Sequence, residues 1–208
     1  ENREARYFNW DDVLFRTGFF TTNDLSVSGG TDKTKYYSSL SYTQDKSRVA
    51  VNEFQRIAGR LNLTQKIGSR LELESNIGIS KNDKSGFNDS RSTGSNYMLQ
   101  SRNLLWPVYW PTDYKTGLPF TARFGSLAQN NVYYDNEWDN TAGTLNISAV
   151  EALTVNILSG LTAKSIFSYN NSQIKEHLYY SALHFSGVAP VNGQVHELST
   201  NINKMVSS

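Results

Sequence analysis

The stretch NDLSVSGGTDKTKYYSSLSYTQD, residues 23–45, alternates apolar and small polar side chains on both sides of one turn. Leu25 and Val27 alternate with serines before the turn, and Leu40 and Tyr42 alternate with Ser and Thr after it. Period-two alternation around a turn rich in Gly and Asp predicts an antiparallel β-hairpin. The functional question is whether the apolar face of this hairpin contacts a protein core or lipid.

The same alternation predicts six strands, at about residues 23–30, 34–45, 54–66, 70–82, 144–156 and 161–172. One face of these strands is apolar, and we expect it to face lipid: Leu25, Val27, Leu40, Tyr42, Ile57, Leu61, Leu63, Leu71, Leu73, Ile77, Ile79, Leu145, Ile147, Leu161, Phe167 and Tyr169. The opposite face of the third and fourth strands is polar, and we expect it to face a lumen: Arg56, Arg60, Asn62, Glu72, Glu74 and Asn76. On that face we expect the two glutamates to lie beside the two arginines of the adjacent strand.

Glu151 breaks the pattern, because it falls on the apolar face of the fifth predicted strand. A carboxylate there indicates either a local β-bulge or a position near the lipid head groups.

The predicted connections alternate in length. They are short after the first, third and fifth strands, whereas about residues 84–140 follow the fourth and a tail of about 35 residues follows the sixth. Short turns at one end and long loops at the other are typical of outer-membrane β-barrels, with the turns in the periplasm. A soluble sandwich usually has comparable connections at both ends. The predicted fold class is therefore all-β, an antiparallel transmembrane β-barrel.

Strand parity predicts that the chain is one segment of a larger barrel. If the short turns are periplasmic, the first strand runs from the outside inward, so an upward strand should precede it. The tail, 192–208, ends where a further downward strand should start. Six strands are also too few to enclose the long polar side chains of the inner face. We therefore treat residues 1–208 as part of one barrel domain.

Composition excludes several classes of protein. The 208 residues have a mean hydropathy of −0.51 and contain no run near the roughly 18 apolar residues of a transmembrane helix. A net charge of +1, from 20 basic and 19 acidic residues, gives no reason to expect nucleic-acid binding. There is no cysteine, and the charged start ENREARYFNWDD lacks the apolar core of a signal peptide.

Four stretches of the chain, taken in order, resemble the SusC/RagA-type TonB-linked outer-membrane proteins of Bacteroidota. They are residues 9–45, which look like the barrel-entry signature of that family, and residues 54–80, 104–120 and 145–170. Two departures are Asp24, where the family often has His, and DKSRVAV after the second strand, where a Gly-Ile pair is usual.

The resemblance implies a barrel of about 22 strands, an N-terminal plug, opening driven by TonB, and a SusD-like surface lipoprotein that closes the top as a lid. It implies import of oligosaccharides or peptides across the bacterial outer membrane. The plug and the TonB-contacting segment are not in these 208 residues, so we expect barrel wall and outer loop here, and no transport by this chain alone.

The long loop is rich in aromatic residues, with 11 between residues 85 and 139. Aromatic faces suit sugar rings and protein anchors. The loop aromatics have three interpretations: they pack within the loop, contact the lid lipoprotein or contact substrate. The candidates for the last two are Trp106, Tyr109, Trp110, Tyr114 and Trp138.

No catalytic or metal-binding pattern is present, so we expect neither an enzyme nor a cofactor. Asp135, Glu137 and Asp139 lack EF-hand spacing, as does NDKSGFNDS at 82–90, and both are better explained as solvated loop residues. The three histidines, His177, His184 and His196, also lack the spacing of metal ligands.

Three functions follow from these patterns. The first is the wall of a nutrient transporter. The second is a SusC-like structural subunit of a larger outer-membrane assembly, without transport. The third is a soluble β-sandwich that binds carbohydrate through Trp106, Trp110 and Trp138.

Overall fold

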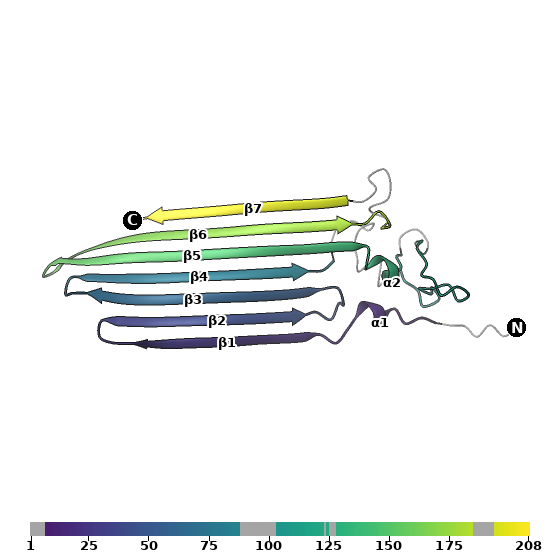
Figure 1. The fold of residues 1–208 in the computed structure, drawn as a ribbon, viewed down its shortest axis with the longest axis horizontal. Coiled ribbons are helices and arrows are strands. Elements are labelled where there is room, and N and C mark those ends of the chain that lie inside the picture. Colours follow the sequence, from purple (N-terminus) through teal and green to yellow (C-terminus); the bar gives the residue numbers. More distant parts are fainter. Residues whose placement is uncertain (1–6, 88–102, 123, 125–127, 185–193) are drawn as a thin grey trace.

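The computed structural model describes residues 7–87, 103–122, 124, 128–184 and 194–208. These residues form one antiparallel sheet in which each strand pairs with the next along the chain, in the order β1 to β7 (Figure 1). The strands are β1 Phe19–Gly30, β2 Thr34–Lys46, β3 Glu53–Ile67, β4 Leu71–Ser85, β5 Trp138–Leu158, β6 Leu161–Tyr180 and β7 Gln194–Ser207. Two short helices, α1 Asp11–Leu14 and α2 Asn131–Tyr134, lie beyond one end of the sheet.

Tight turns join the strands at the end away from the helices. Residues 31–33, 68–70 and 159–160 connect β1 to β2, β3 to β4 and β5 to β6. In the first turn the Thr31 hydroxyl accepts hydrogen bonds from the backbone N–H groups of Lys33 and Thr34, at 3.3 and 3.2 Å. The other two turns use Gly68 and Gly160, whose φ angles of +66° and +84° suit glycine. Local turn chemistry therefore sets the hairpin register.

These turns are staggered along the sheet. The first lies beside Lys66 of β3, whose backbone N–H donates to the Lys33 carbonyl at 2.7 Å. The third turn lies further out than the second, because the N–H of Asn156, two residues before the end of β5, donates to the carbonyl of Arg70 in the second turn at 2.7 Å. Between the first and the third turn, the shift along the strands is about five residues, or about 17 Å. The two turns are four strand spacings apart, or about 19 Å across the sheet. If the turns share one level, the strands tilt by about 40°, within the range of membrane-barrel strands.

The structure differs from the predicted elements in one strand and several ends. The tail that was expected to follow the sixth strand forms β7, which pairs with β6 from Phe167↔Ser207 to Tyr180↔Gln194. β1 begins at Phe19, β5 begins at Trp138 and β6 continues to Tyr180, so the hairpins reach further toward the long connections than the alternation indicated. Apolar and polar side chains do not alternate cleanly at these ends, as in Phe19-Phe20 of β1 and Leu178-Tyr179-Tyr180 of β6, so the period-two pattern was masked.

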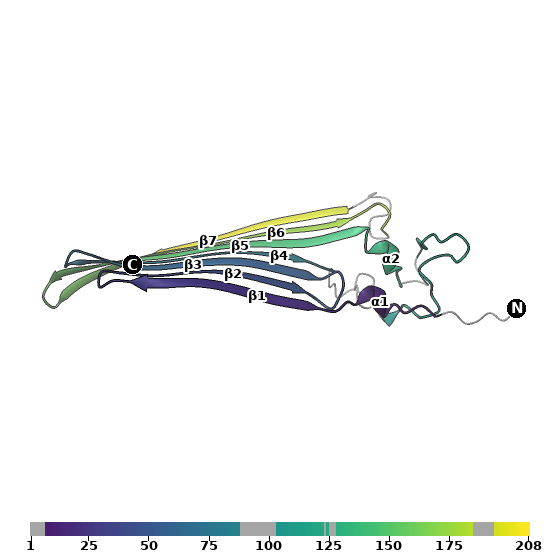
Figure 2. The ribbon, with the colours of Figure 1, turned by 60° about the horizontal axis from the view of Figure 1, so that its bottom comes forward.

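The sheet is a single layer. Figure 2 shows one bowed sheet with both helices past its end, and within the described ranges no second sheet faces it. Of the hydrophobic side chains buried in the described residues, only Ala152 belongs to a strand interior, whereas Trp10, Leu14, Leu105, Ala128 and Tyr134 lie at the helix end. A sandwich needs two facing sheets, so the third interpretation is not supported by this architecture.

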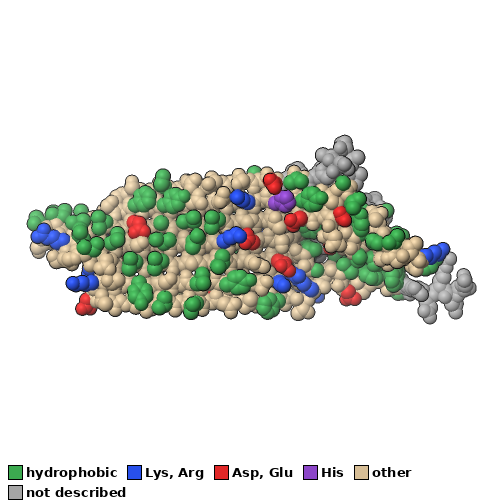
Figure 3. Space-filling model, viewed as in Figure 1, with side chains coloured by type: hydrophobic (Ala, Val, Ile, Leu, Met, Phe, Trp, Pro, Cys, Tyr) green, Lys and Arg blue, Asp and Glu red, His purple; other side chains and the backbone are tan. Residues whose placement is uncertain are grey.

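Large hydrophobic side chains on the sheet remain exposed, such as Leu25 at 73%, Leu40 at 52% and Ile79 at 50%. Figure 3 shows one broad face of the molecule, with hydrophobic side chains scattered along its whole length. Most of the charged side chains in that view lie at the tight turns or toward the helix end. Exposure on this scale marks a surface that contacts something apolar.

Candidate functional site

The long connections and the segment before β1 fold together at one end of the sheet. Trp10 and Leu14 of the N-terminal segment pack with Leu105 and Ala128 of the β4–β5 connection. The Trp10 indole N–H donates to the Tyr109 carbonyl at 3.0 Å. We call the four packed residues, with the side chains around them, the end cluster. It is the main hydrophobic core of the described residues, and it joins parts of the chain that are about 100 residues apart.

Arg16 connects this cluster to the sheet. Its guanidinium donates to the Ser47 and Asn52 carbonyls at 3.1 and 3.0 Å and lies 3.1 Å from a Glu53 carboxylate oxygen. All three partners belong to the β2–β3 connection or the start of β3. Arg16 therefore holds the entry to β1 against the next hairpin.

A small hairpin projects from the β4–β5 connection at residues 111–120. The backbone N–H of Asp113 donates to the Leu118 carbonyl, and that of Phe120 donates to the Pro111 carbonyl, both at 2.9 Å. Asn130, which has no exposed surface, donates from Nδ2 to the Pro111 and Phe120 carbonyls, each at 2.8 Å. One buried amide thus bridges both sides of the hairpin at its base. We call residues 111–120 the loop hairpin.

The tip of the loop hairpin is ordered by Asp113. Its carboxylate accepts hydrogen bonds from the backbone N–H groups of Lys115 and Thr116, at 2.7 and 3.0 Å. These two bonds, first that of Lys115, lower the pKa of Asp113 below its ordinary value. Gly117, at φ +72°, completes the turn.

The five aromatic candidates divide between core and surface. Tyr109 stacks on Phe124 with ring centroids 4.9 Å apart, and both Tyr109 and Trp138 pack against the end cluster. Trp106 and Tyr114 are 62% and 82% exposed, and Trp110 is 36% exposed. Self-packing therefore accounts for Tyr109 and Trp138, while the other three residues present aromatic surface on and beside the loop hairpin.

The strand register places the sixteen predicted lipid-facing residues on one face of the sheet. Leu25 pairs with Leu40, Leu40 with Gly59, Gly59 with Ile79 and Ile79 with Ile147. We call this the odd face, after the residue numbers it carries in six of the seven strands. Arg56, Arg60, Asn62, Glu72, Glu74 and Asn76 lie on the opposite, even face.

The expected pairing of glutamates with arginines on the even face is wrong. Arg56 and Arg60 lie opposite Asn82 and Gly78 in the register, not opposite the glutamates. Glu74 instead accepts from Lys164 of β6 at 3.0 Å. The lysine reaches across β5, where Ala152 lies opposite Glu74 and is only 5% exposed. Sequence alone missed this ion pair because it skips a strand.

No β-bulge occurs at Glu151, contrary to one of the two expectations. The register runs through Ser75↔Glu151↔Phe167 without a break, and the irregularity lies at Asn156/Leu158. Glu151 is instead paired, because the Ser75 hydroxyl, in a residue 8% exposed, donates to it at 2.6 Å. A neighbouring hydroxyl thus satisfies the one carboxylate in this part of the odd face.

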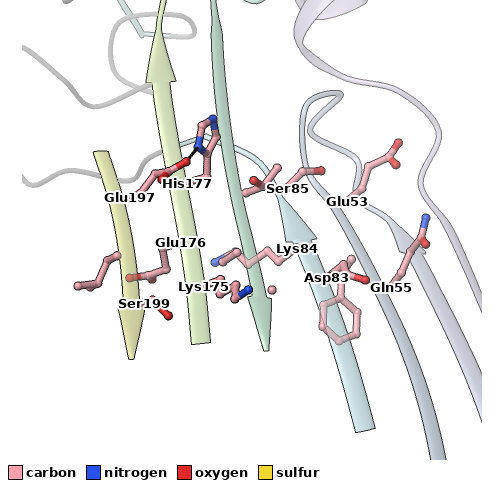
Figure 4. A pocket seen from close by; sticks show the side chains of 15 residues that line it. Glu53, Gln55, Asp83, Lys84, Ser85, Lys175, Glu176, His177, Glu197 and Ser199 are labelled. Carbon is pink, nitrogen blue, oxygen red and sulfur yellow. Dashed lines mark hydrogen bonds and ion pairs between the residues drawn. The ribbon is translucent and has the colours of Figure 1, made fainter. Parts of the chain in front are cut away.

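A hollow of about 910 Å³ crosses β3 to β7 near the helix end (Figure 4). Its lining comes from three consecutive register rows and mixes charged, polar and apolar residues, and His177 lies 3.2 Å from Glu197 in it. The other charged members of the lining are Glu53, Asp83, Lys84, Lys175 and Glu176.

The described part of the chain brings no three His, Cys, Asp or Glu side chains together as metal ligands. His184 is buried against Tyr134 and Tyr180 rather than set in a site of this kind, and part of 82–90 lies outside the described residues. Within the described ranges, no helix has the length and apolarity needed to cross a membrane.

Sequence reasoning missed the residues that organise the outer end. Asn130, Arg16 and Trp10 act through contacts between distant segments, and no local pattern marks them. The amide side chains of β7, Asn201 and Asn203, were missed because that strand was not assigned. Their period-two spacing was the available signal.

No family model matches this sequence. Over 55 residues, which are 26% of the chain, it is 36% identical to the TonB-dependent receptor SusC of Bacteroides thetaiotaomicron. That match covers 6% of SusC.

Solved structures match nearly the whole chain. A chain of the RagAB peptide importer in the closed-closed state superposes with a TM-score of 0.72 over 98% of this chain, at 19% identity. The RagAB peptide transporter and the open-open importer give TM-scores of 0.70 and 0.67, at 18% and 17% identity. The chain spans 22–24% of these solved chains. The relatives are a receptor and an importer, not enzymes. The chain thus resembles the SusC/RagA-type TonB-dependent receptors, in sequence over 55 residues and in its all-β fold over almost its full length.

Proposed function

We propose that this chain is barrel wall and outer loop of an outer-membrane TonB-dependent transporter. The observation that carries the proposal is the single-layer antiparallel sheet with an uncovered apolar face, matched over 98% of the chain by a chain of a peptide importer. The protein imports oligosaccharides or peptides together with a SusD-like lipoprotein lid, and TonB acts through a plug that lies outside these residues.

In this proposal the odd face contacts outer-membrane lipid. Support comes from the height of its apolar band. From Ile57 to Ile67 the band extends about 34 Å along β3, or about 26 Å along the membrane normal at a tilt of about 40°. Membrane barrels have an outward apolar band about 25 Å tall. The even face, with Arg60, Asn62 and Glu74, then lines the lumen.

The outer end then faces the medium. Trp106, Trp110 and Tyr114, the exposed aromatics around the loop hairpin, are the proposed contacts for the lid lipoprotein or the substrate. Tyr109 and Trp138 support this surface from below through the end cluster.

The test uses single cysteines in a cysteine-free version of the full-length protein, for which residues 1–208 need no replacement because they contain no cysteine. Leu40→Cys and Asn62→Cys place a fluorophore on the odd and even faces, on adjacent strands. A lipid-soluble quencher should act on the first label and a water-soluble one on the second. Quenching in the reverse pattern contradicts the assignment, and so does recovery of the full-length protein in the aqueous fraction without detergent.

The alternative is a structural subunit without transport, which the fold alone accommodates equally well. Deletion of TonB discriminates between the two. It should abolish uptake of the nutrient by a transporter and leave a structural assembly unchanged.

A further inference from the structure

A cluster of asparagines lies on the odd face where β6 and β7 pair. Asn171 of β6 donates from Nδ2 to the Oδ1 of Asn201, at 2.6 Å, and to that of Asn203. Asn203 also accepts from the Tyr169 hydroxyl at 3.2 Å and donates to Asn201 at 3.4 Å. We call these three asparagines the amide cluster. It is exposed, and it is part of neither the end cluster nor the loop hairpin.

The internal bonds leave hydrogen-bonding capacity unused. Three asparagines carry six N–H donors, and the bonds above use three of them. Within the described part of the chain, both N–H groups of Asn201 and one of Asn203 remain available, as does the Asn171 carbonyl oxygen. On the same face of β6, Gln173 and Lys175 follow Asn171. The surface therefore presents amide groups, with an ammonium group further along the same face of β6.

The register explains why amides stand where other strands carry apolar side chains. Asn171 and Asn203 lie in the row of Leu40, Gly59, Ile79 and Ile147. At the tilt of about 40° that follows if the turns share one level, a residue four strands along a row lies about 12 Å higher above the turns. The row therefore lies within the apolar band from β2 to β5 and above the band in β6 and β7. The amide cluster lies just above the upper edge of the band.

Aromatic and amide side chains meet at the level of the amide cluster. Tyr169 and Phe167 lie directly below the amide cluster on the same face of β6, and Met205 pairs with Tyr169 in the register. An aromatic ring with amide and ammonium donors above it suits a phosphorylated sugar attached to acyl chains, because the ring covers apolar surface while the donors bind hydroxyl and phosphate oxygens. A protein partner is less well suited, since the next residues above Tyr169 on this face of β6, Asn171, Gln173 and Lys175, are all polar.

We propose that the amide cluster binds the phosphorylated sugar head group of a glycolipid in the outer leaflet. The acyl chains of that lipid lie against the apolar band below. The proposal rests on the proposed function, because it requires that the odd face contact lipid.

The experiment uses the full-length protein in nanodiscs made from phosphatidylethanolamine with or without added fluorescent lipopolysaccharide. Energy transfer from a label on Leu25→Cys, on the same face, reports binding of the glycolipid. Asn171→Ala with Asn203→Ala should weaken the apparent affinity at least about tenfold, equivalent to 1.4 kcal/mol. The matched control is Asn62→Ala with Asn76→Ala, a cross-strand asparagine pair on the even face, which should leave it unchanged.

A second variant distinguishes loss of binding from loss of folding. Asn201→Asp keeps the size of the side chain and places a negative charge beside the phosphate, so it should also weaken binding, and raised salt should reduce its effect. Wild-type affinity in both amide variants overturns the proposal. If those variants bind normally while Leu40→Cys is still quenched from the lipid, this inference alone fails. If Leu40→Cys is not quenched, the proposed function fails.

Discussion

Asn130→Asp tests whether one buried amide holds the loop hairpin. The substitution keeps the size of the side chain and replaces the Nδ2 donor, which bonds the Pro111 and Phe120 carbonyls at 2.8 Å each, with an oxygen. Two hydrogen bonds at about 0.5–1.5 kcal/mol each are lost, and a buried carboxylate facing two carbonyls costs about 1–3 kcal/mol more. We expect the loop hairpin to lose about 3 kcal/mol of local stability.

The assay is amide hydrogen exchange in the full-length protein. The N–H groups of Asp113, Gly117 and Phe120, which bond within the loop hairpin, report its opening. A loss of about 3 kcal/mol accelerates their exchange more than about 100-fold, since 1.4 kcal/mol is a factor of ten. Exchange within β3 and β4 should stay unchanged, because the sheet does not depend on this contact.

Asn136→Asp is the matched control. Its amide is exposed and donates at 3.3 Å to the Val132 carbonyl in the same connection, so the change should cost less than about 0.5 kcal/mol. Acidification should partly restore the Asn130→Asp variant, because a protonated carboxyl can donate one hydrogen bond. Equal exchange in the two variants, or no recovery in acid, refutes the proposed role of Asn130.

The remaining predictions concern the end cluster, the hairpin tip and the odd face. Leu14→Ala opens a cavity at a fully buried side chain and should cost about 2–5 kcal/mol. Exchange in residues 7–16 and 103–122 should rise together, and a rise in the first range alone contradicts a shared core. Asp113 has a lowered pKa, so its contribution to the turn is present above the ordinary value of 3.8 and is lost as the pH falls through the folded value. Protection of the Lys115 and Thr116 N–H groups against exchange should therefore drop in acid. Constant protection would contradict this role of the Asp113 carboxylate. Ser75→Ala removes the donor to Glu151 and should lower the unfolding free energy in detergent by about 1–3 kcal/mol. Glu151→Gln keeps an acceptor oxygen and should cost less, whereas equal losses contradict the pairing.

Much of the sheet could be predicted from the sequence. The alternation of Leu25, Val27, Leu40 and Tyr42 gives the facing of the first hairpin, because side-chain direction in a strand has a period of two. Glycines at the turns and the lengths of the connections give the order of the strands and the end at which the loops gather. β7 and the outer ends of β5 and β6 were harder to assign, because the change from apolar to polar on the odd face follows the tilt of the strands rather than their length.

The candidate site was less accessible to this reasoning. The aromatic loop was found by composition, but composition does not distinguish Tyr109, stacked on Phe124 inside the end cluster, from Tyr114, which is 82% exposed. Their difference depends on residues 8–16, which are distant in the chain.

The sequence by itself determined the antiparallel hairpins, the two contrasting faces and the asymmetry between turns and loops, since each arises from neighbours along the chain. Only the tertiary structure decided that Glu74 pairs with Lys164 across β5, that Ser75 satisfies Glu151, and that Asn130 ties down the loop hairpin. Those contacts join side chains that are between 10 and 90 residues apart. Their geometry follows from strand register and loop packing, which no local pattern encodes.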